Sequence, residues 1–171
     1  MATKSKAFRS RSTDQICQGD IFKNVKYSYI DSEDGESVNI VEYEFPLALI
    51  ISQACDVIAM EDLTVKKCGK PAKFMPSILM CPIYEQSAAK SGQHIKEAFE
   101  QLALNFESEN TYQGDDYKVA KRDWHYRIHA LTVNVDEKDV IENAVIDFKH
   151  YFTVPMTYLI AHKKRSNPSF G

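Results

Sequence analysis

The segment from residue 45 to residue 56 constrains the fold of this chain most strongly. Its first part, residues 45–51, is strand-length and almost entirely apolar. Because a strand that is apolar on both faces is buried on both faces, this part predicts a central strand of a sheet. The polar residues that follow it are Ser52, Gln53, Cys55 and Asp56. The Gly19-Asp20 pair, earlier in the chain, predicts a tight turn that opens a preceding strand.

The remaining sequence predicts an α+β domain. Apolar runs predict strands over residues 21–30, 38–45, 47–52, 77–84, 119–135 and 140–152. Apolar residues at helical spacing predict one amphipathic helix over 87–107, with Ser91 as its N-cap, and a short helix over 155–164. Residues 57–76 predict an irregular excursion. Short connections between most strands favour a strongly bent antiparallel sheet that closes into a small β-barrel with the helix inserted.

Length and charge limit the organisation of the chain. The 171 residues suit one domain, expected over residues 14–165, between a flexible basic tail (1–13) and a C-terminal tail (166–171). The net charge of −3 excludes general affinity for nucleic acid, so such affinity requires a local basic patch. Neither a membrane-spanning run nor a signal-peptide core is recognisable, which predicts a cytoplasmic protein without membrane contact.

A local basic patch begins at Lys121 and Arg122. In an extended strand, His125, Arg127 and His129 project from one face, and aromatic or aliphatic side chains project from the other. Such a face can hold a phosphate backbone beside stacked bases, and the histidines are candidate acid–base groups with the guanidinium as charge stabiliser. The alternative is a solvated strand face over an apolar core.

The polar cluster after residue 51 also has two interpretations. Ser52 and Asp56 either close the strand by bonding turn amides or, with Gln53, line a groove shared with the basic patch. Cys55 is either a structural thiol or a nucleophile, which needs a histidine of the basic patch as its base. A single curled sheet is expected to bring the cluster and the patch to one rim.

Metal and cofactor signals are weak. The cysteines form no Cys-x-x-Cys pair, which predicts reduced thiols, and no glycine-rich phosphate loop is present. A metal site assembled from distant strands stays open as an alternative, but neither a metal nor a cofactor is expected. The cysteines are Cys17, Cys55, Cys68 and Cys81.

Three segments resemble the opening strands of the MazF/PemK toxin family: Gly19-Asp20-Ile21, residues 45–52 and residues 77–83. Members read roughly G-D-[ILV], R-P-[AV]-[LV]-[ILV]-[LI]-S and apolar-x-[AVC]-P-[ILV]-T. The resemblance implies an SH3-like barrel with a helix, and metal-independent cleavage of single-stranded RNA. Phe45 stands where the family has arginine, and no threonine stands at positions 84–86, where the family's threonine would fall. Without that guanidinium the cleavage loses its main charge stabiliser, so the resemblance favours the fold over the ribonuclease activity.

A second resemblance spans nearly the whole chain. Gly19-Asp20-Ile21, the Ser-Gln-x-Cys-Asp motif of residues 52–56, and the Asp-Phe-x-x-Tyr-Phe motif that begins at Asp147 are similar to uncharacterised bacterial and phage proteins. This resemblance implies no known activity.

These observations predict a barrel protein of a bacterial or phage toxin–antitoxin or defence system that binds or acts on single-stranded RNA or DNA. The rival interpretations are a non-catalytic module that docks to a protein encoded in the same operon, and a cysteine-dependent hydrolase. The candidate catalytic residues are His125, His129, Arg127, Cys55 and Asp56. The candidate nucleic-acid contacts are Lys121, Arg122, Arg127, Ser52 and Gln53.

Overall fold

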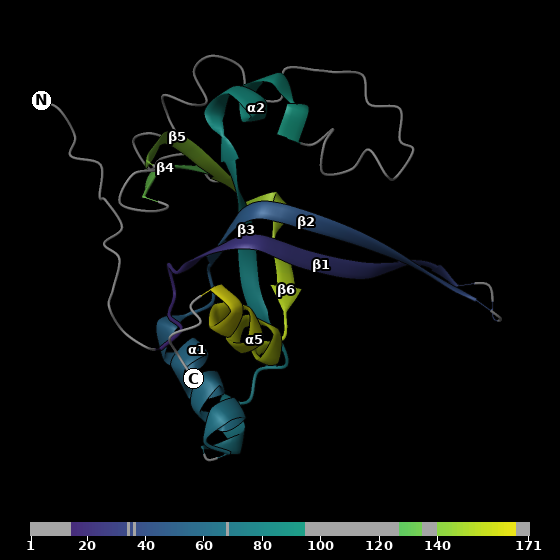
Figure 1. Ribbon diagram of the computed structural model, residues 1–171, viewed down its shortest axis with the longest axis vertical. Coiled ribbons are helices and arrows are strands. Elements are labelled where there is room, and N and C mark those ends of the chain that lie inside the picture. The colour runs from purple at the N-terminus through teal and green to yellow at the C-terminus, as the bar shows by residue number, and fades with distance from the viewer. Residues whose placement is uncertain are drawn as a thin grey trace, which may run out of the picture.

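The computed structural model contains an antiparallel sheet of six strands, and helices lie below and above this sheet (Figure 1). The structure describes residues 15–33, 35, 37–67, 69–94, 127–134 and 140–166. The strands are β1 (Ile21–Glu33), β2 (Val38–Ile50), β3 (Ile78–Glu85), β4 (Ile128–Asn134), β5 (Val140–Asp147) and β6 (Phe152–Val154). The helices are α1 (Ala54–Val65), α2 (Gln86–Ser91) and α5 (Met156–Ser166), with 3₁₀ turns η1 (Pro71–Lys73) and η3 (Phe148–His150). The predicted α+β class is confirmed.

The described strands form an open sheet. Their order is β1-β2-β3-β5-β4, with β6 paired to β3, so β1 and β4 lie at the two ends of the path. Neighbouring strands β2 and β3 pair through Ala48–Pro82, Leu49–Cys81 and Ile50–Met80. The two apolar segments of residues 47–52 and 77–84 are therefore neighbours in the sheet. The two end strands do not pair with one another, so the described part of the chain does not show a closed barrel.

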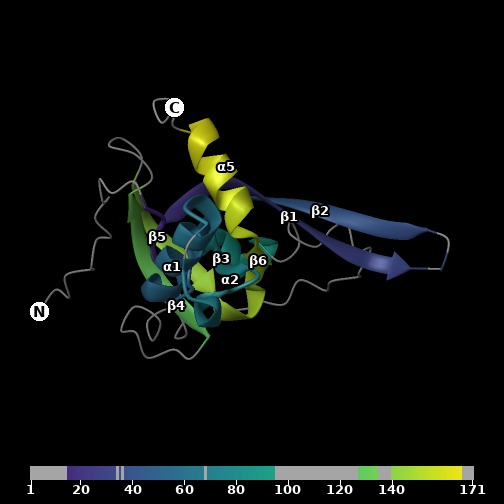
Figure 2. The same ribbon diagram turned by 90° about the horizontal axis from the view of Figure 1, so that it is seen from below.

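Strands β1 and β2 form a long hairpin that extends beyond the rest of the molecule in both views (Figures 1 and 2). The two strands pair along their whole length, whereas β2 pairs with β3 only at Ala48–Ile50. Within the described residues, the outer part of the hairpin is therefore a two-stranded ribbon, which we call the arm (residues 28–42). Within the inner part of the hairpin, Pro46 lies opposite Asn24, which has a left-handed φ of 52°, and both residues are skipped in the ladder.

Helix α1 corrects the prediction of an irregular excursion over residues 57–76, because residues 57–65 are helical. Gln53 is extended (φ −60°, ψ 138°), and the helix begins at the next residue. Cys55 and Asp56 therefore lie in the first turn of the helix. The short apolar runs on either side of Gln53 look alike in sequence, because periodicity does not separate a buried strand from a short buried helix.

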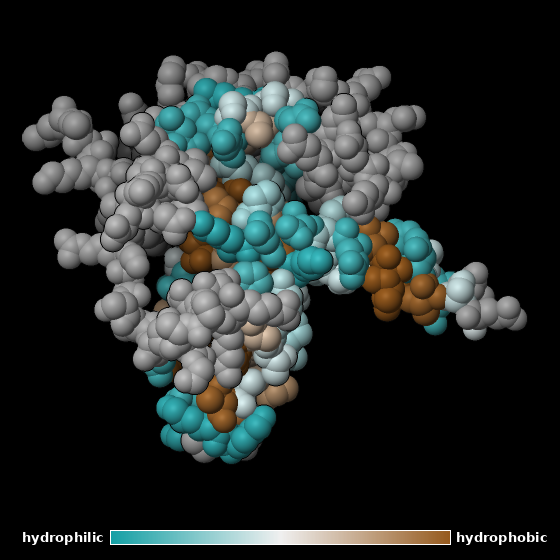
Figure 3. All heavy atoms as spheres, in the orientation of Figure 1, coloured by the Kyte–Doolittle hydropathy of each residue, from teal (hydrophilic) through white to brown (hydrophobic). Residues whose placement is uncertain are grey.

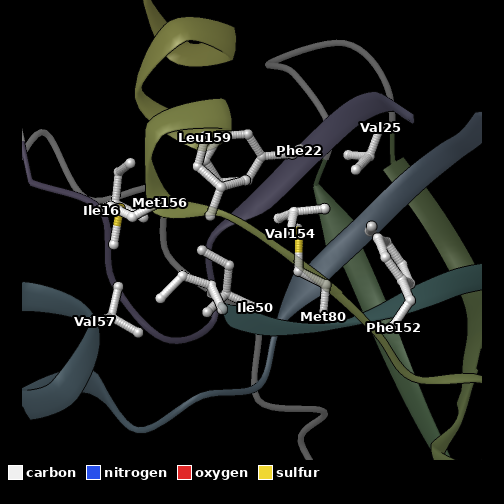
Figure 4. Close-up of a cluster of buried hydrophobic side chains, with 12 residues drawn as sticks. Ile16, Phe22, Val25, Ile50, Val57, Met80, Phe152, Val154, Met156 and Leu159 are labelled. Atoms are coloured by element: carbon white, nitrogen blue, oxygen red, sulfur yellow. The ribbon is translucent and has the colours of Figure 1, made fainter. Parts of the chain in front are cut away.

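The main hydrophobic core lies between the sheet and helices α1 and α5 (Figure 4). Its members come from segments far apart in the sequence, and Ile50, Met80 and Leu159 are fully buried within it. A second cluster around Cys81 and Ile83 packs against β4 and β5. Because β3 contributes to both clusters, its nearly continuous apolar sequence is explained by burial on both faces.

The predicted long helix and the later strands are only partly described. Helix α2 ends at Gly92, whose left-handed φ of 74° terminates it, and the Ser91 hydroxyl accepts a hydrogen bond from the Gln93 amide. Residues 95–107 and 119–126, the rest of the predicted helix and strand, lie outside the described residues. Most of both predicted tails also lies outside the described residues. The predicted C-terminal helix is confirmed as α5, directly after Pro155.

Candidate functional site

A break between β5 and β6 positions the buried polar groups of this protein. Strand β5 pairs with Ile83–Glu85 of β3, and β6 pairs with Ile78–Met80 of the same strand. Between them the chain makes the 3₁₀ turn η3, with Asp147 as its N-cap. The Asp147 carboxylate accepts a hydrogen bond of 3.0 Å from the Lys149 amide. The backbone carbonyl of Asp147 accepts one of 3.2 Å from the Cys81 thiol.

Asp147 and Arg127 form a buried ion pair. The Arg127 Nε lies 2.8 Å from Oδ1 and its Nη2 lies 2.5 Å from Oδ2, a two-pronged arrangement that fits a guanidinium to a carboxylate. The Asp147 side chain is 2% exposed and that of Arg127 is 20% exposed. A buried carboxylate without a charged partner is costly. The buried position of Asp147 therefore requires a cation beside it, which Arg127 supplies.

Two imidazoles adjoin the ion pair. The His150 Nε2 lies 3.7 Å from Asp147 Oδ2, and its Nδ1 lies 3.2 Å from the Tyr84 hydroxyl. The His94 Nδ1 lies 3.1 Å from the carbonyl oxygen of Ala88. Since a carbonyl only accepts, this Nδ1 carries a proton, which leaves Nε2 as the nitrogen with a lone pair in the neutral ring.

Burial controls the charge of this site. It lowers the pKa of His150, although Asp147 opposes the shift, so the imidazole is held toward its neutral form. The residues Tyr84, His94, Arg127, Asp147 and His150 are called the Asp147 cluster below. Within it, one ligand atom each from His94, Asp147 and His150 lies within 4.8 Å of the other two.

The residues predicted to share one rim fall in two places. Ser52 is buried just after β2, and its hydroxyl accepts a hydrogen bond of 2.8 Å from the Leu79 amide of β3 instead of from a turn amide. Asp56 in α1 forms an ion pair with Lys73 at 3.0 Å. Arg127 instead pairs with Asp147, beside β4 and β5. In Figure 1, α1 lies below strands β1 and β2, whereas β4 and β5 lie above them, so the structure does not bring these groups to one rim.

The other predicted site residues have mixed outcomes. Gln53 directly precedes α1, and Cys55 is exposed, with its thiol 3.6 Å from the Asp56 carboxylate. His129 lies in β4 opposite Ile146. The prediction that Cys55 is a buried structural thiol is therefore wrong. Three residues of the basic patch, Lys121, Arg122 and His125, lie outside the described residues.

Sequence reasoning missed Tyr84, His94 and His150 as members of one cluster. His94 is separated from Asp147 by more than fifty positions and has no neighbouring histidine or cysteine to mark it. The available signal was the Asp-Phe-x-x-Tyr-Phe motif, which begins at Asp147 and encloses His150. A buried carboxylate within a short turn is visible only once β5, β6 and β3 are aligned.

The arm carries the most conspicuous apolar surface. Ile30, Ile40 and Val38, near its end, are 63%, 59% and 49% exposed. Figure 3 shows hydrophobic side chains gathered there. Ile30 and Ile40 lie directly opposite each other in the ladder, so they form one continuous patch. Isolated exposed apolar residues are ordinary, whereas these three lie together on a projecting hairpin.

The root of the arm is held by a row of rings. Phe45 stacks on Phe152 with ring centroids 4.7 Å apart, and Tyr43 continues the row outward at 6.4 Å from Phe45. Tyr29 stacks on Tyr43 at 5.7 Å, and their hydroxyls are 3.3 Å apart. The rings therefore stiffen the inner part of the hairpin and leave its end free of the core.

No protein-family model, curated protein or solved structure matches the chain. The MazF/PemK resemblance and the resemblance to bacterial and phage proteins therefore stay predictions. Among the described residues, no helix has both the length and the apolar character needed to cross a bilayer.

The cysteines are expected to differ in reactivity. Burial raises the pKa of the Cys81 thiol to about 12, so it is protonated at pH 8, whereas the Cys55 side chain is exposed. We expect iodoacetamide at pH 8 to alkylate Cys55 and to leave Cys81 unmodified in the folded protein, as read by peptide mass mapping. In 6 M guanidinium both should react. Equal labelling of the two cysteines in the native protein would contradict the burial of Cys81.

Proposed function

We propose that this chain is a non-catalytic protein-interaction module that docks to a partner through the arm. The observation that carries the proposal is the exposed apolar patch of Ile30, Val38 and Ile40 at the end of a projecting hairpin. An isolated two-stranded hairpin is marginally stable in water, so an arm of this kind gains stability when its surface is covered. A partner that binds it also removes the exposed strand edges.

The charge of the arm defines the partner. Between residues 28 and 42 the sequence has no lysine or arginine, and its acidic residues are Asp31, Glu33, Asp34, Glu36 and Glu42. An acidic ribbon with an apolar patch fits an apolar groove bordered by lysine or arginine side chains. The proposed occupant is therefore a different protein with a basic groove, and the main-chain edges of the ribbon are available for strand addition.

The competing proposal is the MazF/PemK-like barrel that binds or cleaves single-stranded nucleic acid in a toxin–antitoxin or defence system. It requires Arg127 to face phosphate and the sheet to close into an SH3-like barrel. The guanidinium of Arg127 is committed to Asp147, and the arm has the charge sign of nucleic acid itself. These two observations support the docking module over the competing proposal. Three residues that would carry the competing proposal lie outside the described residues.

The test uses a photo-crosslinking amino acid at Asn39, beside the patch, in cells that carry the natural gene neighbourhood. The partner recovered at Asn39 is then purified, and its affinity for the unmodified chain is measured. Replacing Ile30 and Ile40 with lysine should weaken that affinity by about 30-fold or more, the effect of losing a central apolar anchor. Glu42→Lys should weaken it further in low salt, because the proposed groove is basic.

The matched control is Phe74→Lys. Phe74 is as exposed as Ile30 but follows η1 instead of lying on the arm, so its replacement should leave the affinity unchanged. Equal loss with Phe74→Lys, or no loss with the double isoleucine variant, would refute docking by the arm. A concentration-dependent dimer of the chain alone that Ile40→Lys dissolves would assign the arm to a second copy. Retention of mixed single-stranded RNA at low salt would favour the competing proposal.

A further inference from the structure

Two imidazoles and one carboxylate converge in the Asp147 cluster. The ligand atoms of His94, Asp147 and His150 lie within 4.8 Å of one another, although the residues come from two segments of the chain. We propose that these three side chains form a binding site for a divalent first-row transition-metal ion such as Zn²⁺. Two ligand atoms on a tetrahedral zinc ion lie about 3.3–3.6 Å apart, so side-chain rotations must bring these atoms up to about 1.5 Å closer to one another.

The groups behind the three ligands have the arrangement that metal sites use. Histidine ligands are usually held by a bond from their other ring nitrogen to a carbonyl, carboxylate or water. Here the His94 Nδ1 is held by the Ala88 carbonyl, and the His150 Nδ1 is held by the Tyr84 hydroxyl. Arg127 and the Lys149 amide fix the carboxylate of Asp147 in the same way. All three ligands are thus oriented before any ion arrives.

The donor chemistry selects the class of ion. Two imidazoles and one carboxylate suit zinc, iron or cobalt, whereas magnesium and calcium prefer oxygen ligands alone. The Arg127–Asp147 ion pair as a whole is close to electrically neutral. The metal ion must therefore be held mainly by the two histidine nitrogens. That charge balance favours a borderline ion with affinity for nitrogen over a hard one.

The experiment uses the untagged full-length chain, treated with EDTA, dialysed and confirmed to be folded by circular dichroism. Zn²⁺ binding is measured by calorimetry, and Co²⁺ binding by the visible absorption of its d–d bands. We expect one equivalent of either ion to bind, with the thermal midpoint raised by added Zn²⁺. Mg²⁺ should compete weakly. A folded apoprotein that takes up no Zn²⁺ or Co²⁺ would overturn the proposal.

Variants separate this site from adventitious binding. Tyr84→Phe keeps the ring and removes only the hydroxyl behind His150, so it should weaken Zn²⁺ binding by about 10–100-fold, the usual effect of losing an outer-shell partner. His150→Ala should weaken it more than Tyr84→Phe does. His129→Ala, a histidine of β4 outside the cluster, should leave binding unchanged. Unchanged affinity in folded Tyr84→Phe and His150→Ala would place the metal elsewhere and overturn the proposal.

Discussion

Arg127→Ala is expected to destabilise the protein by about 3–5 kcal/mol, the usual cost of removing one partner of a buried ion pair. The Asp147 carboxylate would stay almost completely buried and would lose both prongs of the guanidinium. The remaining hydrogen bond from the Lys149 amide does not replace a full positive charge. The measurement is urea unfolding at pH 7, followed by circular dichroism.

The matched control for this prediction is Lys73→Ala. It removes the partner of Asp56 in an ion pair of similar length that is exposed to water, and exposed pairs contribute little to stability. The midpoint of the urea transition should therefore stay close to that of the wild type. If the two variants lose similar stability, Asp147 is reached by water in solution and the burial of the cluster is wrong.

Phe152→Ala is expected to cost about 3–5 kcal/mol, the range for removing a buried phenylalanine from a packed core. Phe152 is 5% exposed, belongs to the main core and contacts both Phe45 and Tyr27. Its removal leaves a cavity at the root of the arm. The free energy of unfolding is measured in urea, and amide hydrogen exchange of β1 and β2 reports whether the arm loosens as well.

Tyr151→Ala provides the control, because Tyr151 is the preceding aromatic residue and its side chain is largely exposed. It should leave both the stability and the exchange rates of the arm close to those of the wild type. If Phe152→Ala destabilises the core without faster exchange in β1 and β2, the row of rings does not brace the arm. The docking proposal would then have to explain how an unbraced ribbon presents Ile30 and Ile40.

The exposed apolar patch of the arm and the Asp147 cluster each carry an energetic cost. The arm keeps apolar side chains in water, which the docking proposal attributes to a partner that covers them. The Asp147 cluster keeps charged and polar side chains away from water, a cost that is offset by the ion pair and, as proposed, by a metal. Among the described residues, neither group belongs to the main core.

Much of the sheet followed from local pattern. The apolar runs of residues 21–30, 38–45 and 77–84 predicted the strands that become β1, β2 and β3. The prediction of an irregular excursion was wrong at residues 57–65, which belong to helix α1. The apolar residues there are spaced ambiguously, and the helix is selected by contacts such as the burial of Val57 in the core and by the bond from the Ile16 amide to Glu61.

The sequence by itself determined the α+β class, the strands that become β1, β2 and β3, and the terminal helix after Pro155, because side-chain periodicity and turn residues act over a few positions. Tertiary structure alone decided that Arg127 meets Asp147 instead of the polar residues after β2. It also decided that His94 and His150 converge. The reason is strand alignment: a 3₁₀ turn between β5 and β6 turns one carboxylate inward, and no local pattern encodes which distant cation will neutralise it.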